Sequence, residues 1–300
     1  MIDLHMHSRY SDDGEFTPER LVFQCREKGI HVMSVTDHNC VRANLEAKMA
    51  AERLGICYIS GGEFDCVYHG RNFHMLGYGI DCLNEAFVRL EQAVEKQSRE
   101  ASLKMLEKTR ALGFLVTEEE LDWISSEGYW KGRWTGEMFG EVLLSKPEYQ
   151  GHVLLEPYRE GGNRGDNPYV NFYWDFYSQG KPCYGAMVYP SMERLIEIIH
   201  EAGGIAVLAH PGANLKGQEK LLREVSALPI DGIEVFSSYH SEAQEEYFLE
   251  IAREFGKLVT CGSDFHGKTK PAISLGEGAA HKNGQAGELV IQALKEGGIL

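Results

Sequence analysis

The chain has 300 residues, of which 43% are hydrophobic and 25% charged, and its formal net charge at pH 7 is −15. These proportions are typical of a globular protein with one large domain, with or without an insert. The acidic balance argues against binding to duplex nucleic acid, which requires a basic surface. Small anionic substrates stay possible, because bound divalent cations reverse the charge locally.

No apolar run approaches the ~18–20 residues that cross a bilayer, and the sequence does not open with a basic stretch followed by an apolar one. The seven cysteines are scattered and form no C-x-x-C pair, which is typical of free thiols in a reducing compartment. We therefore expect a cytoplasmic protein without membrane contact, disulfides or a thiolate zinc site.

The first part of the chain alternates the signals of strands and helices. One helix is expected after Thr17, a typical N-cap that Pro18 follows, and another from Leu45 to Leu54. The strands are expected at residues 2–6, 31–36 and 57–64, and short strand alternation is expected to resume at 64–69 and 72–80. Each of these strands carries or precedes a histidine or an acidic residue that could bind a ligand.

From about Asn84 the pattern becomes a long charged helix that runs to Leu112, and no strand signal follows before Tyr184. This stretch includes the Trp- and Gly-rich sequence GYWKGRWTG at 128–136. We expect residues 98–184 to form a mostly helical inserted domain that caps the site built by the strands. A purely structural helical appendage is the alternative.

After Pro190 the alternation of helix and strand returns and continues to a last helix at about 286–295. Strands are expected at 205–210, 232–236 and 257–266. Repeated β-then-α units are typical of an α/β fold with a parallel sheet or barrel, in which functional side chains gather at the C-terminal ends of the strands. Residues 1–97 and 185–300 would then form one catalytic domain.

Metal-ligand side chains mark the expected strand ends. His5 and His7 are two residues apart, as are Asp264 and His266, so each pair projects from one face of an extended segment. The first and last strands of a barrel are neighbours, which would bring the pairs together. The full set has more donors than one cation uses, so we expect two or three divalent metals. The set is His5, His7, Asp12, His38, Glu63, His74, His210, Asp264 and His266.

Six segments, taken in order, closely resemble the polymerase and histidinol phosphatase (PHP) family of metal-dependent phosphoesterases: IDLHMHSRYSD, SVTDHN, GGEF, HMLGYGI, LAHPG and SDFHG. The resemblance implies a distorted (β/α)7 barrel that holds two or three Mn, Fe or Zn ions at the nine residues above. Asp13 is one acidic residue more than the shorter S-D-G form of the first loop has. We favour Asp12 as the ligand because it keeps the spacing from His7.

The expected insert resembles the smaller domain of stand-alone members of this family, in which an arginine contacts the substrate phosphate. Arg133 is the best match, and Lys268 and His240 are weaker candidates at the rim. The alternatives for these three are a surface ion pair, a solvated lysine and a polar residue at a helix start. Ala213 and Asn214 follow the HPG motif where related sequences often carry a basic residue, which puts a phosphate contact from that loop in doubt.

We therefore expect an enzyme that hydrolyses phosphate esters of small metabolites with a metal-bridging hydroxide. The expected substrates are 3′,5′-bisphosphonucleotides, short oligonucleotides, or cyclic phosphates of sugars and nucleotides, with inorganic phosphate as a product. A barrel amidohydrolase that acts on a carbonyl is an alternative, although its pattern ends in a lone aspartate. A non-catalytic PHP module is another, although such a module should have lost ligands.

Overall fold

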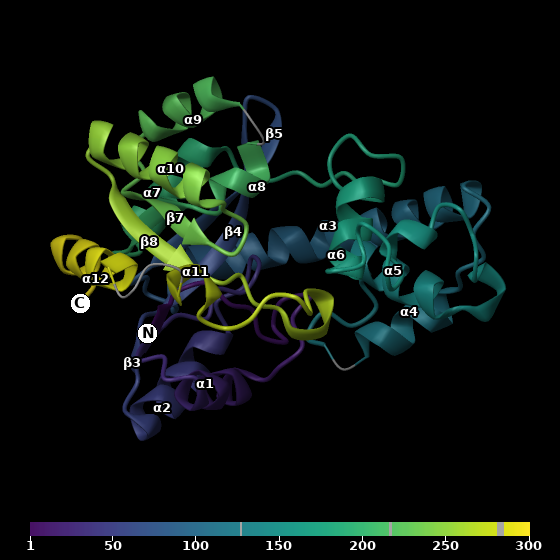
Figure 1. Ribbon diagram of the computed structural model, residues 1–300, viewed down its shortest axis with the longest axis horizontal. Coiled ribbons are helices and arrows are strands. Elements are labelled where there is room, and N and C mark those ends of the chain that lie inside the picture. Colours follow the sequence, from purple (N-terminus) through teal and green to yellow (C-terminus); the bar gives the residue numbers. More distant parts are fainter. Residues whose placement is uncertain (127, 216–217, 281–284) are drawn as a thin grey trace.

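Two sheets organise the strands of the protein, whose computed structural model describes residues 1–126, 128–215, 218–280 and 285–300 (Figure 1). The first sheet is parallel and consists of β1 (Ile2–Asp3), β2 (Val32–Met33) and β3 (Cys57–Tyr58). The second sheet follows the order of the sequence. Its strands are β4 (Gly61–Tyr68), β5 (Arg71–Tyr78), β6 (Ile205–Leu208), β7 (Gly232–Ser237) and β8 (Leu258–Gly262).

A hairpin gives the second sheet a mixed direction. β4 and β5 pair antiparallel, with Tyr68 opposite Arg71. His69 and Gly70 alone connect them, and both have positive φ angles, 48° and 76°, as a tight two-residue turn requires. β5 also pairs antiparallel with β6, whereas β6, β7 and β8 are parallel. The parallel arrangement predicted from the β-then-α repeats therefore holds within β1–β3 and within β6–β8.

The first and last strands lie side by side, as the sequence predicted. The amide of Leu4 donates to the carbonyl of Cys261 at 3.1 Å, and the amide of Asp264 donates to the carbonyl of His5 at 2.8 Å. Within the described residues the strands still form two sheets and not one closed sheet. Each of the first three strands has only two residues, which is too short for a continuous ladder. The α/β class is confirmed.

Helices cover both sheets. α1 (Pro18–Glu27) starts where the sequence predicts, since the Thr17 hydroxyl accepts a hydrogen bond from the amide of Arg20 at 3.2 Å. Leu21 of α1 and Ala47 of α2 (Ala43–Leu54) are buried against Met33 of β2 in one cluster. The remaining helices of this part are α7 (Met192–Glu201), α8 (Pro211–Leu215), α9 (Glu219–Ser226), α10 (Glu242–Glu254), α11 (Glu277–Ala280) and α12 (Gln285–Glu296).

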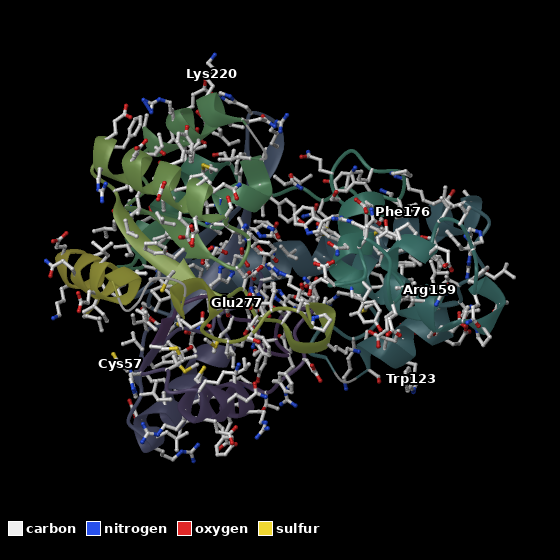
Figure 2. All side chains as sticks on the ribbon, viewed as in Figure 1. Cys57, Trp123, Arg159, Phe176, Lys220 and Glu277 are labelled. Carbon is white, nitrogen blue, oxygen red and sulfur yellow. The ribbon has the colours of Figure 1, made fainter. Side chains whose placement is uncertain are left out.

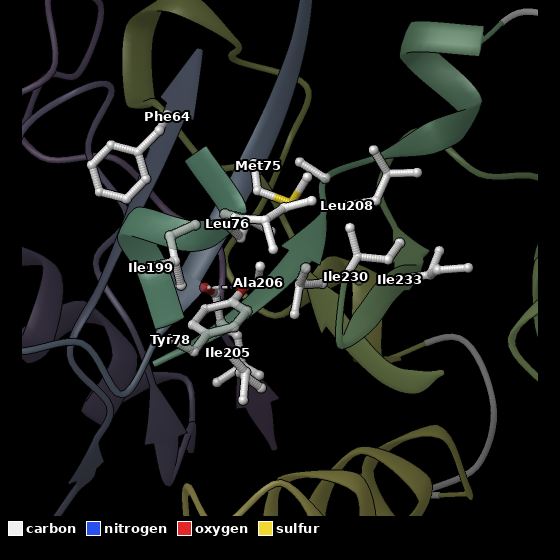
Figure 3. Packing of buried hydrophobic residues seen from close by; sticks show 14 of the residues in the cluster. Phe64, Met75, Leu76, Tyr78, Ile199, Ile205, Ala206, Leu208, Ile230 and Ile233 are labelled. Atoms are coloured by element: carbon white, nitrogen blue, oxygen red, sulfur yellow. Dashed lines mark hydrogen bonds between the residues drawn. The ribbon is translucent and has the colours of Figure 1, made fainter. Parts of the chain in front are cut away.

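The largest hydrophobic core lies between the second sheet and its helices (Figure 3). Phe64 of β4, Met75 of β5 and Ile233 of β7 are buried there. The hydroxyl of Tyr78, at the end of β5, donates to the carbonyl of Leu4 at 3.0 Å. This bond ties the core of the second sheet to the N-terminal segment, and so fixes the position of the residues that follow Leu4.

The residues between β5 and α7 form a separate group of helices, here called the helical segment (85–176), which Figure 1 shows to the right of the sheets. Phe114, Trp134, Phe139 and Phe172 are buried in a cluster of this segment. Trp123 is 77% exposed at its surface (Figure 2). The elements are α3 (Glu85–Ala111), α4 (Glu118–Ser125), α5 (Gly136–Ser145), η1 (Pro147–Tyr149), η2 (Glu156–Tyr158) and α6 (Pro168–Phe176).

The long charged helix expected from Asn84 to Leu112 is α3. Its N-cap is Asn84, whose side-chain oxygen accepts a hydrogen bond from the amide of Ala86 at 2.9 Å. Among the helices of the described ranges, none is both long and apolar enough to cross a membrane.

Candidate metal centre

Histidine and carboxylate side chains from both sheets converge on one place. Figure 2 shows nitrogen and oxygen atoms crowded at the centre of the molecule, between the sheets and the helical segment. Three overlapping groups each have their potential ligand atoms within 4.8 Å of one another. The groups are His5, His7, Glu63 and Asp264; His38, Glu63 and His74; and His7, Asp13, His38 and His266.

The first group has the spacing of a metal site. The Nε2 atom of His5 lies 3.1 Å from Oε2 of Glu63 and 3.2 Å from Oδ1 of Asp264. The Nε2 atom of His7 lies 3.2 Å and 3.1 Å from the same two oxygens. Four ligands at the usual ~2.0–2.1 Å from a tetrahedral ion would lie roughly 3.4 Å apart. This group therefore matches the dimensions of a transition-metal site.

Glu63 presents its two carboxylate oxygens to different groups. Its Oε1 atom lies 2.9 Å from Nδ1 of His74 and 2.9 Å from Nε2 of His210. Its Oε2 atom lies 3.3 Å from Nδ1 of His38, and it also faces His5 and His7. One carboxylate is therefore shared by neighbouring sites, which is the arrangement of a bridging ligand.

Asp13, and not the expected Asp12, joins the third group. The Oδ2 atom of Asp13 lies 3.1 Å from Nε2 of His266 and 3.8 Å from Nε2 of His38. The Asp12 side chain is exposed. The loop turns at Ser11, whose amide donates to the carbonyl of Ser8, and the Thr269 hydroxyl holds the Asp13 carbonyl at 2.7 Å. These tertiary contacts decide which acid faces inward, and spacing from His7 cannot reveal them.

Several buried ligand atoms have no hydrogen-bond partner among the described residues. Buried polar atoms are almost always paired, so unpaired atoms that lie close together mark a place where a bound group would pair with them. Nitrogen lone pairs and carboxylate oxygens are also the donors that Mn, Fe and Zn accept. The residues therefore fit a cluster of divalent metals. The unpaired atoms are Nε2 of His7, Oδ1 of Asp13, Nδ1 of His74, Nδ1 of His210, Oδ1 of Asp264 and Nε2 of His266.

A second layer of polar groups orients the histidines. Oε1 of Glu234 lies 2.9 Å from Nδ1 of His5, and its Oε2 accepts the amide hydrogen of His210 at 2.8 Å. Ser11 Oγ lies 2.8 Å from Nδ1 of His7. Such partners fix the ring and its tautomer, so that the other nitrogen faces the metal.

The local electrostatics keep the ligand carboxylates ionised. Burial alone would raise the pKa of Glu63, but the positive field of His5, His74 and His38 holds it well below its usual range. Burial would likewise raise the pKa of Asp264, but the nearby positive charges, above all that of Lys270, hold this pKa well below its usual range. Metals bind deprotonated carboxylates, so both groups are in the form that a metal requires.

A cavity of about 490 Å³ opens beside these ligands, between the sheets and the helical segment. We call it the cleft. Its volume lies in the range of small-molecule sites. Asp13, His38 and His74 line it at the ligand end. The cleft also carries cations, namely Arg71, Arg133, Lys181 and Lys270, and aromatic side chains, namely Trp130, Trp134, Tyr173, Trp174, Tyr177, Tyr184 and Tyr189.

Arg133 lines the cleft, as the resemblance implied for a phosphate contact. Its Nη2 atom pairs with the Glu95 carboxylate, and its guanidinium lies 4.9 Å from the centre of the Trp130 ring. Only 20% of its side chain is exposed. The arginine is therefore held in one orientation by groups of the helical segment.

Lys268 and His240, the weaker candidates, do not line the cleft within the described residues. The Nζ atom of Lys268 lies 2.9 Å from both carboxylate oxygens of Glu141. His240 is only 8% exposed; its Nδ1 lies 2.7 Å from the carbonyl of Val235, and its Nε2 accepts the amide hydrogen of Gly212 at 3.0 Å. Burial lowers the pKa of His240 to about 4. It therefore supports the loop after His210 as a neutral side chain.

Two buried ionisable side chains of the cleft were not among the predicted residues. Lys270 is 6% exposed and lies two residues after Lys268 in the sequence KTK. Glu137, in the first turn of α5, is 8% exposed, and burial together with Asp13 raises its pKa to about 8. Their proximity in sequence to Lys268 and Arg133 was the available signal. Their burial depends on packing between distant segments and is not visible in the sequence.

Two relatives with similar sequences are named as a phosphatase and a phosphodiesterase. The 3′,5′-nucleoside bisphosphate phosphatase of Chromobacterium violaceum is 31% identical over an alignment of 270 positions that covers 88% of this chain and 87% of that protein. The phosphoribosyl 1,2-cyclic phosphate 1,2-diphosphodiesterase of Eggerthella lenta is 28% identical, over 89% of this chain and 94% of that protein.

A solved structure from Bifidobacterium adolescentis, assigned as a metal-dependent phosphoesterase, superposes with a TM-score of 0.76 and 27% identity. The match covers 98% of this chain and 96% of that one. The family model described as the PHP domain matches residues 3–257. Since this match spans most of the sequence, the chain belongs to the PHP domain family.

Proposed function

We propose that the protein is a metal-dependent phosphoesterase that hydrolyses phosphate esters of nucleotides. The observation that carries the proposal is the set of three overlapping ligand groups, two of which share Glu63, at one end of a cleft that also carries cationic and aromatic side chains. The activities named for the two relatives, a bisphosphate phosphatase and a cyclic phosphodiesterase, support this class of reaction.

Three metal positions account for the ligand atoms. His5, His7, Glu63 and Asp264 would hold one ion; Glu63, His74 and His210 a second; and Asp13, His38 and His266 a third. Mn, Fe and Zn all suit these donors. When bound, such ions neutralise phosphoryl oxygens as Lewis acids and make a bound water acidic enough to yield a nucleophile at neutral pH.

The side chains of the protein position the substrate. Arg133 presents a planar fork of donors that matches a phosphate, and Trp130 and Glu95 hold it in the cleft wall. Glu234 holds His5 through Nδ1 and so directs Nε2 to the first ligand group. Aromatic side chains such as Tyr173 and Trp174 offer flat surfaces on which a nucleobase can stack.

We also infer that the two sheets together form the distorted (β/α)7 barrel of the family, which the contacts between β1 and β8 support. Residues 98–184 would be an inserted cap, and 1–97 with 185–300 the catalytic domain. The separate hydrophobic cluster of the helical segment supports this division. All seven cysteines are free, which supports the cytoplasm as the location.

Release of phosphate by the metal-loaded protein tests the proposal. The panel holds 3′,5′-bisphosphonucleotides, mononucleotides, short oligoribonucleotides, and cyclic and sugar phosphates, with a second phosphatase added to reveal diester products. We expect turnover of at least one nucleotide substrate, and loss of that turnover in His38→Ala, which removes a residue of two ligand groups. No turnover of any phosphate ester, combined with cleavage of an amide or lactone, would instead identify an amidohydrolase.

A further inference from the structure

Lys270 is the cation of the cleft that contacts a metal-ligand residue. It follows the short helix η3 (Gly267–Thr269) and is almost fully buried. Its Nζ atom lies 2.6 Å from Oδ2 of Asp264. Among the described residues, no comparable contact is present for the other cleft cations: Arg133 pairs with Glu95, and Arg71 and Lys181 form no ion pair.

The contacts of Asp264 divide its carboxylate into two halves. Oδ1 faces Nε2 of His5 and Nε2 of His7, whereas Oδ2 accepts hydrogen bonds from Lys270 and from the hydroxyl of Tyr239 at 2.8 Å. The Nζ atom also lies 5.4 Å from the centre of the Tyr239 ring. One carboxylate therefore faces the first ligand group on one side and fixes the ammonium group on the other.

This position suits a contact with a phosphate. The ligand end of the cleft is acidic, with Asp12, Asp13, Asp65 and Glu137 along its walls, and Lys270 is the basic side chain there. An ammonium group has three donors, of which the Asp264 contact uses one. Charge-assisted hydrogen bonds from such a group to phosphate oxygens are short and strong.

We propose that Lys270 is a catalytic residue that donates a hydrogen bond to a phosphoryl oxygen of the substrate at the metal centre. The inference rests on the proposed phosphoesterase function and adds a second cation to Arg133. Arg133 approaches the phosphate from the helical segment, and Lys270 approaches it from the loop that follows His266. Two cations from different segments would then fix the phosphoryl group at the metal centre.

The test compares Lys270→Met and Lys270→Arg with Lys268→Met, a matched control that removes a lysine from the same loop but outside the cleft. We expect kcat/KM of Lys270→Met to fall about 10- to 100-fold, as for loss of a hydrogen bond to a charged group. Lys270→Arg should keep more activity, and the control should stay within about twofold of the wild type.

A binding measurement separates this role from an effect on the metals. Inorganic phosphate should raise the melting temperature of the metal-loaded wild type and raise that of Lys270→Met less, while both proteins keep the same metal content. Loss of metal that accounts for the lost activity would overturn the proposal, because Lys270 would then act through Asp264. The proposal would also be overturned if inorganic phosphate raised the melting temperature of Lys270→Met as much as that of the wild type.

If Lys270→Met does not fold, Lys270→Gln keeps a hydrogen-bond donor on a shorter side chain and removes the charge, and the same losses are expected. A wild type that releases no phosphate would contradict the proposed function itself. An active wild type matched by Lys270→Met or Lys270→Gln would contradict only the role of Lys270.

Discussion

Two neighbouring acids of the loop after β1 have different environments. Asp13 has a side chain that is only 9% exposed and lies 3.1 Å from His266, whereas the Asp12 side chain is exposed in the cleft. At the scale of single residues, therefore, only Asp13 has the position of a ligand in the third group.

We expect Asp13→Asn to lose about one equivalent of metal and more than ~100-fold in turnover, beyond the ~10–100-fold typical of residues that only orient a ligand. Asp12→Asn is the matched control, since it makes the same chemical change one position away, and it should keep its metal content. Elemental analysis of protein purified without chelator provides the measurement. Equal metal loss in the two variants would contradict the assignment of Asp13.

The sequence predicted the ligand residues from local features and missed what depends on packing. The pairs His5/His7 and Asp264/His266 could be found because an i, i+2 spacing fixes the face of an extended segment. The exposure of Lys268 and the burial of Lys270 could not be found, because these depend on how their loop meets Glu141 and Asp264. The spacing of residues along a strand therefore predicts the face from which a side chain projects, but it does not predict whether that side chain is buried.

At the scale of elements, helix bounds were predictable and strand pairing was only partly so. The caps Thr17 and Asn84 mark the starts of α1 and α3, because capping is a local interaction. The tight turn at His69-Gly70 was not predicted to reverse the chain, since a histidine with positive φ is uncommon. The lengths of the first strands depend on contacts between distant segments, so the sequence did not reveal how short they are.

The loop after β6 provides a prediction about pH. The pKa of His240 is lowered to about 4 by burial, below the ~6.5 of an unfolded histidine. The unfolded chain therefore binds more protons between these values, so the stabilisation is present above about pH 6.5 and is lost as the pH falls toward 4. Between about pH 7 and about pH 5 the free energy of unfolding should fall by about 2 kcal/mol through this group.

Urea unfolding of the metal-free protein at the two pH values measures this fall. His240→Gln cannot titrate, so its free energy of unfolding should fall about 2 kcal/mol less over the same interval. The variant should also be less stable at neutral pH, because the contacts with Gly212 and Val235 are disturbed. Identical pH dependence of the variant and the wild type would show that His240 does not titrate in this way.

At the scale of the whole molecule, the metal centre joins segments that are distant in sequence. The indole nitrogen of Trp130, in the helical segment, donates to the carbonyl of Tyr10 at 2.7 Å, and the amide of Tyr129 donates to the carbonyl of Arg9 at 3.1 Å. The loop that carries Asp13 is therefore held between the sheets and the helical segment. Metals bound at Asp13 and Glu63 would link this loop to β4 of the second sheet as well.

Removal of the metals should therefore destabilise the whole protein. Without metal, burial opposes protonation of His7, but Asp264 and Glu63 outweigh it and raise its pKa to about 9, so this histidine is protonated at neutral pH. A metal must displace that proton, and its affinity should rise with pH up to about 9. A ligand that binds only the folded state at about 100 times its dissociation constant adds about 2.7 kcal/mol.

Thermal unfolding with and without a chelator measures this effect. For a chain of this size we expect the melting temperature to fall by about 5 °C or more for each site that is emptied, and to recover when Mn, Fe or Zn is added back. The recovery should be smaller at about pH 6 than at about pH 8, since protons compete at His7. Asp264→Asn is the control, because this change weakens one ligand group. The melting temperature of this variant should recover less than that of the wild type when metal is added back. If the metal-depleted protein and the holoprotein had the same melting temperature, this result would contradict the coupling of metal binding to folding.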